Sequence, residues 1–147
     1  NNYWEIRMSE QESYLIFGLR GGLYAIPLPL VQQIIRLKAD YFNQKGLCRG
    51  EILYKGKTLP LVDLCFLFSE HHLLSIGEGI ILTPPQACLI VENVLDVWEH
   101  CDPMQVLPEE TQPLHYFLGT IRMNKNIVLV LNLPLLLQKI HKDAHYE

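Results

Sequence analysis

The chain has 147 residues, of which 49% are hydrophobic and 19% are charged, and its net charge is -4. This acidic balance argues against nucleic acid as a partner, because such binding needs clustered cations, and no stretch approaches the ~20 apolar residues of a membrane-spanning helix. A domain of this length buries roughly 70% of its unfolded surface, which is enough for a core without disulfides or metal.

The first elements in chain order are a polar lead-in over residues 1–13 and a β-hairpin. The apolar runs Tyr14–Leu19 and Leu23–Ile26 flank the turn-forming sequence Arg20-Gly21-Gly22. Two β-prone runs separated by a glycine-rich turn predict a pair of antiparallel strands.

The next segment has the pattern of a short amphipathic helix. Pro29 suits the first turn of a helix, where a missing N–H has no partner to lose. Val31, Ile34 and Ile35 would then share one face. An apolar stripe at helical spacing is core in most proteins, so we expect these side chains to pack inward, with one of them partly exposed.

A duplication relates the two halves of the chain. Gly50 lies thirteen positions before Asp63, Gly119 lies thirteen positions before Asn132, and the second pair follows the first by 69 positions. In each copy the glycine is followed by two apolar runs with a short polar break between them, which predicts a hairpin. Asp63 and Asn132 are good N-cap residues, so each copy is predicted to end as strand, cap and short helix.

Three short apolar runs between and beside the copies predict further strands: residues 79–82, 87–91 and 94–98. His100–His115 contains three prolines and predicts an exposed connection. The C-terminal helix is expected to end in a polar tail over residues 141–147. Roughly nine or ten short strands and few helices indicate a mainly β protein, and the duplication favours two small β-barrels within a single domain over residues 1–147.

The cysteines are widely spaced along the chain: Cys48, Cys65, Cys88 and Cys101. None forms the two-residue interval of zinc or redox motifs, so we expect buried free thiols in the reducing cytoplasm. His71 and His72 near Cys65 supply too few ligands for a metal. Capping accounts for Asp63, so the sequence indicates no catalytic, cofactor or metal residue.

Several motifs occur together in one order: Tyr14–Phe17, Val31–Ile35, Arg49-Gly50, Lys55-Gly56, Leu59–Leu64, Val94–Val97 and the stretch from Gly119 to Leu137. Together they resemble the CheW family of bacterial chemotaxis coupling proteins, over nearly the whole chain. The resemblance implies two five-stranded β-barrels that share a hydrophobic core, with a few short helices and no catalytic activity.

The resemblance also implies two partners. Such adaptors link transmembrane chemoreceptors to the histidine kinase CheA: one barrel meets the kinase regulatory domain, and a groove between the barrels takes the cytoplasmic tip of the receptor. Modest contacts become effective when they are repeated in an array. The protein is therefore expected in the cytoplasm, recruited to membrane-associated receptor arrays without inserting into the membrane.

The predicted partner-binding positions are Lys55, Arg49, Glu51, Val31, Ile34 and Ile35. Lys55 stands at a hairpin tip that resembles the family's Asn-Leu-Arg-Gly, and it is our choice for receptor contact, although hairpin-tip lysines are often merely solvated. Arg49 and Glu51 flank Gly50, and strand alternation would place both on one outward face as a solvated ion pair. The three apolar residues would line the groove between the barrels.

Departures from the family pattern leave other functions open. Lys55 lacks the guanidinium fork of the usual arginine, and Cys65 stands where a basic residue is frequent. An adaptor of a surface-motility pathway, or a regulatory domain cut from a larger kinase or a receiver-containing protein, would share the fold. A small Cys/His enzyme and a nucleic-acid-binding barrel are the alternatives from other classes.

Overall fold

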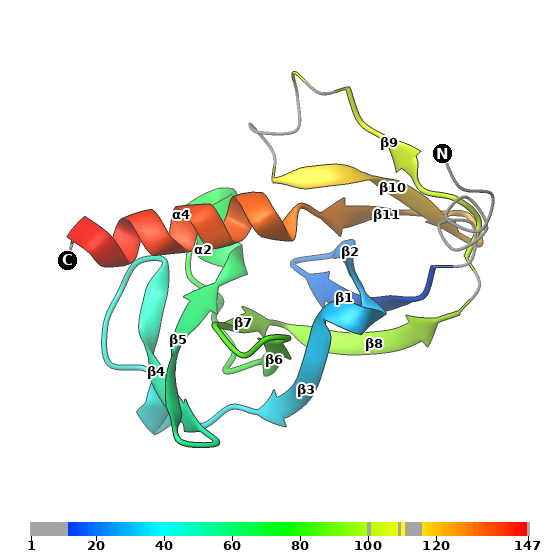
Figure 1. The fold of residues 1–147 in the computed structure, drawn as a ribbon. Coiled ribbons are helices and arrows are strands. Elements are labelled where there is room, and N and C mark those ends of the chain that lie inside the picture. Colours follow the sequence, from blue (N-terminus) through cyan, green and yellow to red (C-terminus); the bar gives the residue numbers. More distant parts are fainter. Residues whose placement is uncertain (1–11, 100, 109, 111–115, 147) are drawn as a thin grey trace.

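The computed structural model describes residues 12–99, 101–108, 110 and 116–146 (Figure 1). The strands are β1 (Tyr14–Leu19), β2 (Gly22–Pro27), β3 (Val31–Arg36), β4 (Cys48–Tyr54), β5 (Lys57–Asp63), β6 (Glu78–Leu82), β7 (Cys88–Val91), β8 (Asn93–Trp98), β9 (Gln105–Val106), β10 (Phe117–Met123) and β11 (Asn126–Leu131). The helical elements are the short 3₁₀ turns η1 (Leu28–Leu30) and η2 (Ala39–Tyr41) and the α-helices α2 (Leu64–Ser69) and α4 (Leu133–Tyr146). The prediction of a mainly β protein is confirmed.

The strands form two sheets with matching internal order. One sheet has the order β8-β1-β2-β11-β10-β9 and the other has the order β3-β6-β7-β5-β4. In each sheet an antiparallel hairpin is joined to a duplicated unit by one parallel pairing, β2 with β11 and β7 with β5. The sequence duplication is therefore a duplication of structure, and each copy ends in an α-helix, α2 or α4.

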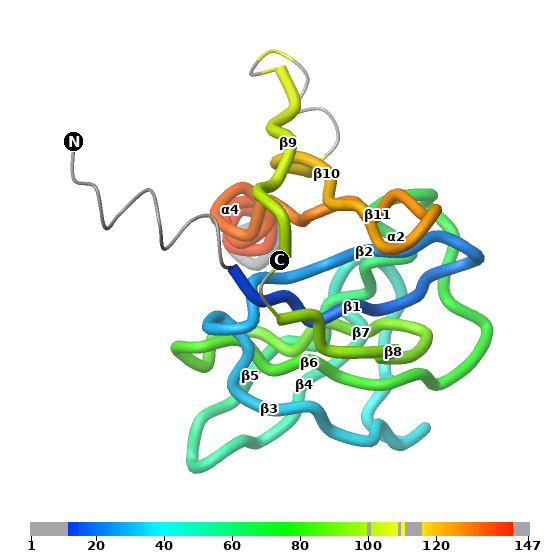
Figure 2. The backbone as a smooth tube through the Cα atoms, turned by 90° about the vertical axis from the view of Figure 1, so that its right-hand side faces the viewer, coloured from blue at the N-terminus to red at the C-terminus, as the bar shows by residue number. Residues whose placement is uncertain are grey.

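The β1–β2 hairpin lies in the middle of the molecule. Figure 2, turned by 90° from Figure 1, shows β9, β10 and β11 on one side of this hairpin and the five-stranded sheet on the other. This arrangement lets β1 and β2 contribute side chains to both lobes.

The predicted closed barrels are corrected to two curled, open sheets. Among the described strands, no continuous backbone ladder joins the outer strands of either sheet. In the five-stranded sheet a side-chain contact spans the seam instead, because the Tyr54 hydroxyl on β4 donates a hydrogen bond to Gln33 Oε1 on β3 at 2.9 Å.

Three apolar clusters hold the lobes together. The six-stranded sheet packs one around Ile16 and Val128, and the five-stranded sheet packs another around Leu59 and Ile81. The third lies between the sheets and draws on both sheets and both α-helices: Phe17, Leu89, Leu64 and Leu136. Full burial of each such side chain contributes about 1.5–3 kcal/mol. The predicted shared core is confirmed.

Aromatic rings reinforce the junction between the lobes. The ring of Tyr24 on β2 stacks against those of Phe17, Phe68 and Phe117, with centroids 5.4–5.8 Å apart. Such pairs add about 0.5–1.5 kcal/mol each beyond the burial of their area. The cluster fixes α2, through Phe68, against strands of the other lobe.

The prediction of a helix after Pro29 is wrong. Only Leu28–Leu30 make a single 3₁₀ turn, and Val31–Arg36 pair with β6 as an edge strand. The β-branched Val31, Ile34 and Ile35 fit an extended backbone better than a helix, and β6 offers an edge to which they can bond. A bulge between Val31 and Gln33 disturbs the alternation that would have shown the strand in the sequence.

The C-terminal end of the chain differs in part from the expectation. The helix α4 runs from Leu133 to Tyr146 and so continues into the segment predicted to be a polar tail. The lead-in predicted over residues 1–13 lies outside the described residues except for its last two. The connection predicted over residues 100–115 is described only in part, and there it contributes β9, which pairs with β10 at Gly119.

Candidate functional site

Lys55 occupies the tip of the β4–β5 hairpin, as the sequence predicted. Lys55 and Gly56 have φ angles of +48° and +79°, the signature of a tight two-residue hairpin turn. The side chain is exposed, and its Nζ lies 5.4 Å from the centroid of the Tyr54 ring. The charge is thus presented at the surface beside an aromatic ring.

The seam of the five-stranded sheet brings Lys55 close to β3. The Tyr54–Gln33 hydrogen bond joins the immediate neighbour of Lys55 to the immediate neighbour of Ile34. Ile34 is 39% exposed. We call Gln33, Ile34, Tyr54 and Lys55 the hairpin–β3 surface.

The other two apolar residues predicted for this site face inward. Val31 packs against the cluster between the lobes, and Ile35 packs against the core of the five-stranded sheet. Both are half-buried, so they support Ile34 more than they offer contact area. We expected one of the three to be partly exposed, but all three are, and Ile34 is the most exposed.

Arg49 does not share a solvated face with Glu51. Its Nη1 lies 3.1 Å from Oδ2 of Asp63, and the exposed fractions of the two side chains are 17% and 0%. The Arg49 Nε also donates to the Gln44 carbonyl at 2.9 Å. A bulge between Cys48 and Gly50 breaks the strand alternation on which the prediction depended, so Arg49 turns inward while Glu51 stays exposed.

The ion pair was missed by the sequence reasoning, although the duplication contains a signal for it. The positions equivalent to Arg49 and Asp63 in the second copy, 69 residues on, are Leu118 and Asn132. Both charges are therefore absent together from that copy, as expected when each charge needs the other.

The capping roles of Asp63 and Asn132 are confirmed. Asp63 Oδ1 accepts the backbone N–H of Phe66 at 3.2 Å, and Asn132 Oδ1 accepts that of Leu135 at 3.2 Å. Asp63 Oδ2 also accepts the N–H of Leu73 at 3.4 Å. The carboxylate is thus fully occupied by structural contacts.

Two further apolar side chains are exposed on β8, the outer strand of the other sheet. These are Leu95 and Val97. The N–H of Val94 on β8 donates to Glu78 Oε1 at 2.7 Å. In the backbone pairing of β3 with β6, Glu78 lies opposite Arg36, the last residue of β3. The outer strands of the two sheets are therefore linked at one end, and both views place them in the lower half of the molecule (Figures 1 and 2).

The thiols are all free and buried, as predicted. Burial raises the pKa of Cys88 to about 12, and it also raises the pKa of Cys101. The Cys65 Sγ lies 3.8 Å from the Ser69 hydroxyl, while Nε2 of His72 accepts the N–H of Gly46 at 2.9 Å. In the part of the chain that the structure describes, no three His, Cys, Asp or Glu side chains could hold a metal ion together.

These environments predict thiols that are slow to react. At neutral pH, iodoacetamide should modify Cys88 at least ~100-fold more slowly in the folded protein than in urea, because only the thiolate attacks and burial disfavours it. Mass spectrometry of the alkylated peptides over time would give the four rates. A thiol that reacted faster in the folded protein than in urea would revive the hypothesis of a cysteine-dependent enzyme.

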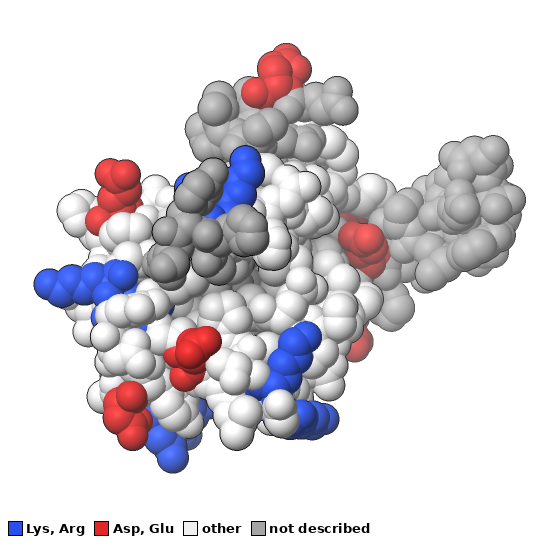
Figure 3. Space-filling model, turned by 60° about the vertical axis from the view of Figure 1, so that its left-hand side comes forward, with Lys and Arg blue, Asp and Glu red and all other residues white. Residues whose placement is uncertain are grey.

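Charges are mixed on the surface that Figure 3 shows. Lys and Arg side chains alternate with Asp and Glu over this face, without a broad area of one sign. Within the described residues, no helix combines the length and apolar character needed to span a bilayer.

The described residues define a two-lobed β protein in which charged and capping groups hold the fold while apolar side chains remain exposed at outer strands. The chain belongs to the CheW-like domain family, whose model matches residues 13–141. It is similar to the crystal structure of the scaffolding protein TtCheW from Thermoanaerobacter tengcongensis, with a TM-score of 0.69 and 20% identity over 82% of this chain and 88% of that chain. The comparison with curated proteins found no match.

Proposed function

We propose that the protein is a non-catalytic adaptor that couples transmembrane chemoreceptors to the histidine kinase CheA. It acts in the cytoplasm, at membrane-associated receptor arrays. The observation that supports this proposal most is the hairpin–β3 surface, where the Tyr54–Gln33 hydrogen bond links the chain neighbours of a lysine and an exposed isoleucine, on a chain of the CheW-like family. A cation beside an apolar side chain suits a protein partner, because the apolar contact supplies affinity and the charge supplies selectivity.

The receptor contact is assigned to this surface together with β8. Lys55 would meet a carboxylate, and Ile34, Leu95 and Val97 would meet apolar side chains of the receptor tip. All three apolar residues are exposed on the outer strands of the two sheets. Val31 and Ile35 hold β3 in place beneath the contact.

The kinase contact is assigned to the outer strand β4. Glu51 and Leu53 lie two residues apart on this strand, and both are exposed, Leu53 by 76%. Residues two apart on a strand point to the same side, so they form one small patch. Arg49 belongs to the structural ion pair and is therefore proposed only to support β4.

The substitution Lys55→Glu tests the receptor contact. Reversal of this charge should weaken binding of a receptor's cytoplasmic tip about tenfold and leave binding of the kinase regulatory domain unchanged. Calorimetric titration against each purified partner would measure both effects. The matched control is Lys125→Glu, the same charge change at the β10–β11 hairpin tip. Equal losses for both partners, or an equal effect of the control, would show that the surface is misassigned.

Two related roles would use the same fold. A regulatory domain within a larger kinase or a receiver-containing protein would be revealed by the length of the natural reading frame. An adaptor of a surface-motility pathway would bind a kinase domain but not a receptor tip from a flagellar chemotaxis system.

A further inference from the structure

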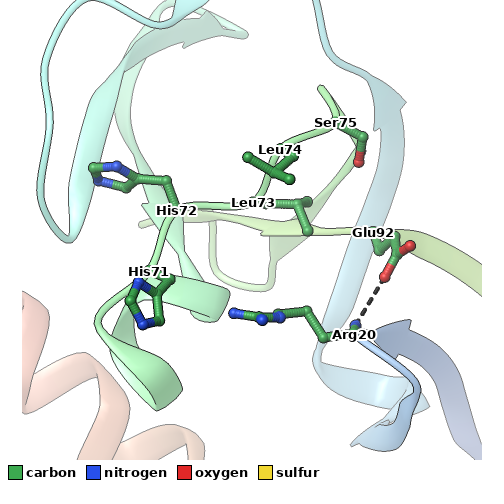
Figure 4. A pocket seen from close by; sticks show the side chains of 7 residues that line it. All are labelled: Arg20, His71, His72, Leu73, Leu74, Ser75 and Glu92. Carbon is green, nitrogen blue, oxygen red and sulfur yellow. Dashed lines mark hydrogen bonds between the residues drawn. The ribbon is translucent and has the colours of Figure 1, made fainter.

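A pocket between the two lobes shares no residue with the surfaces described above (Figure 4). Its volume is about 610 Å³, and it is open to solvent. Three separate segments line it: Arg20 from the β1–β2 hairpin tip, residues 71–75 from the loop after α2, and Glu92 from the turn between β7 and β8. The pocket therefore depends on how the two sheets are packed together.

The acidic side chain in this pocket, Glu92, already accepts a hydrogen bond from the backbone. Glu92 Oε1 accepts the N–H of Arg20 at 2.8 Å, and the N–H of Glu92 donates to the Gly18 carbonyl at 3.2 Å. These bonds hold the hairpin tip, where Arg20 has a φ of +48°. Glu92 thus orients Arg20 through the main chain, and its guanidinium is directed away from the Glu92 carboxylate (Figure 4).

Two nitrogen-bearing side chains, Arg20 and His71, face the same space. The Arg20 guanidinium extends toward the imidazole of His71 across the pocket (Figure 4). Among the described residues the only ion pair is Arg49–Asp63, so the Arg20 guanidinium has no carboxylate partner there. His72 differs, because its Nε2 accepts the Gly46 N–H and its ring stacks on Phe66 at 4.9 Å. His72 therefore forms a fixed wall of the pocket.

An exposed apolar side chain lines the same pocket. Leu74 is fully exposed, whereas its neighbour Leu73 packs into the apolar clusters of the core and anchors the loop. A leucine held in water on an anchored loop gains from burial against a partner. A free phosphate would satisfy Arg20 but would leave Leu74 unused, whereas an acidic peptide with apolar side chains would satisfy both.

We propose that this pocket binds an extended protein segment in which an acidic residue stands next to a large apolar one. The acidic side chain would pair with Arg20 in the two-pronged geometry that guanidinium groups favour, near His71. The apolar side chain would cover Leu74. This contact goes beyond the proposed coupling of receptor and kinase, and it can fail without affecting the test of Lys55.

The test uses a fluorescein-labelled peptide, Ser-Gly-Asp-Leu-Asp-Leu-Gly-Ser with blocked ends, and fluorescence anisotropy. Arg20→Asn should weaken binding about tenfold, the size expected for loss of a charge-assisted hydrogen bond. Asparagine is chosen because it tolerates a positive φ. Leu74→Ser should weaken binding by about threefold to tenfold, since the apolar contact is lost.

The matched controls are Arg122→Asn and Ile127→Ser, an exposed arginine and an exposed isoleucine that do not line the pocket. Both should bind the peptide as the unaltered protein does. A peptide with asparagine in place of both aspartates should lose most of its affinity. The proposal is overturned if no binding is seen at about 1 mM peptide, a concentration at which even a weak complex would form. Equal binding of the asparagine peptide, or equal losses of affinity in the control variants, would also overturn it.

Discussion

Gly50→Ala is expected to lower the free energy of unfolding by about 4 kcal/mol, a large part of the stability of an ordinary domain. Gly50 has a φ of +150°, which side chains rarely tolerate, and a Cβ added there would lie 2.1 Å from the carbonyl oxygen of Tyr41. Backbone strain and steric overlap each cost about 1–3 kcal/mol. The obstructing segment cannot move away cheaply, because Phe42 bridges to Gly50 and the N–H of Asn43 donates to the Arg49 carbonyl.

Urea unfolding followed by circular dichroism would measure this loss, and Gly56→Ala is the matched control. Gly56 also has a positive φ, +79°, but a Cβ there would meet no atom within 4 Å. It should therefore cost only the strain, about 1–2 kcal/mol. If the two variants lost the same stability, close contact with Tyr41 would not be the reason for glycine at position 50.

The second copy offers an internal comparison. A Cβ on Gly119 would lie 2.3 Å from the carbonyl oxygen of Gln105, at the position equivalent to Gly50. Gln105 belongs to the two-residue edge strand β9, which pairs with β10 alone among the described strands. The duplicated glycines therefore have one physical cause: in both copies an outer segment pairs with the bulged strand and comes close to the glycine.

The sequence predicted the fold where several local signals agreed. The glycine, the polar turn and the N-cap residue of the first copy all recur 69 positions later. Each has a local physical cause, which the structure shows. The β1–β2 hairpin was predictable for the same reason. The segment from Pro29 to Ile35 was not, because its spacing fits a helix while its β-branched residues fit a strand, and the available edge of β6 decided between them.

The candidate site was predictable only as far as single residues could be placed. The position of Lys55 at a hairpin tip could be predicted from the turn sequence, which is a local feature. The link between Tyr54 and Gln33 depends on how far the five-stranded sheet curls, and no local pattern contains that information. The inward turn of Arg49 depends on a bulge and on a partner fourteen residues away, so alternation alone gave the wrong face.

Arg49→Leu is expected to cost about 3 kcal/mol of stability, whereas Asp63→Asn should cost only about 1 kcal/mol. Without Arg49 the fully buried carboxylate of Asp63 loses its counter-charge, and breaking a buried pair in this way is strongly destabilising. Asparagine at position 63 removes that charge and still caps α2, as Asn132 caps α4. Its cost arises because its Nδ2 replaces the oxygen that accepts the Leu73 N–H. Arg49 would then keep its bond to the Gln44 carbonyl and its partial exposure to water.

The double variant Arg49→Leu with Asp63→Asn should therefore be more stable than Arg49→Leu alone, since it rebuilds in the first copy the Leu118 and Asn132 of the second. The urea-unfolding free energies of the four proteins form a double-mutant cycle, and we expect a coupling of about 1.5–3 kcal/mol. The coupling should change little with added salt, because a buried pair is weakly screened. Additive losses, or a coupling that vanished in salt, would mean that the pair behaves as a solvated surface contact and that the buried carboxylate is stabilised by its capping bonds alone.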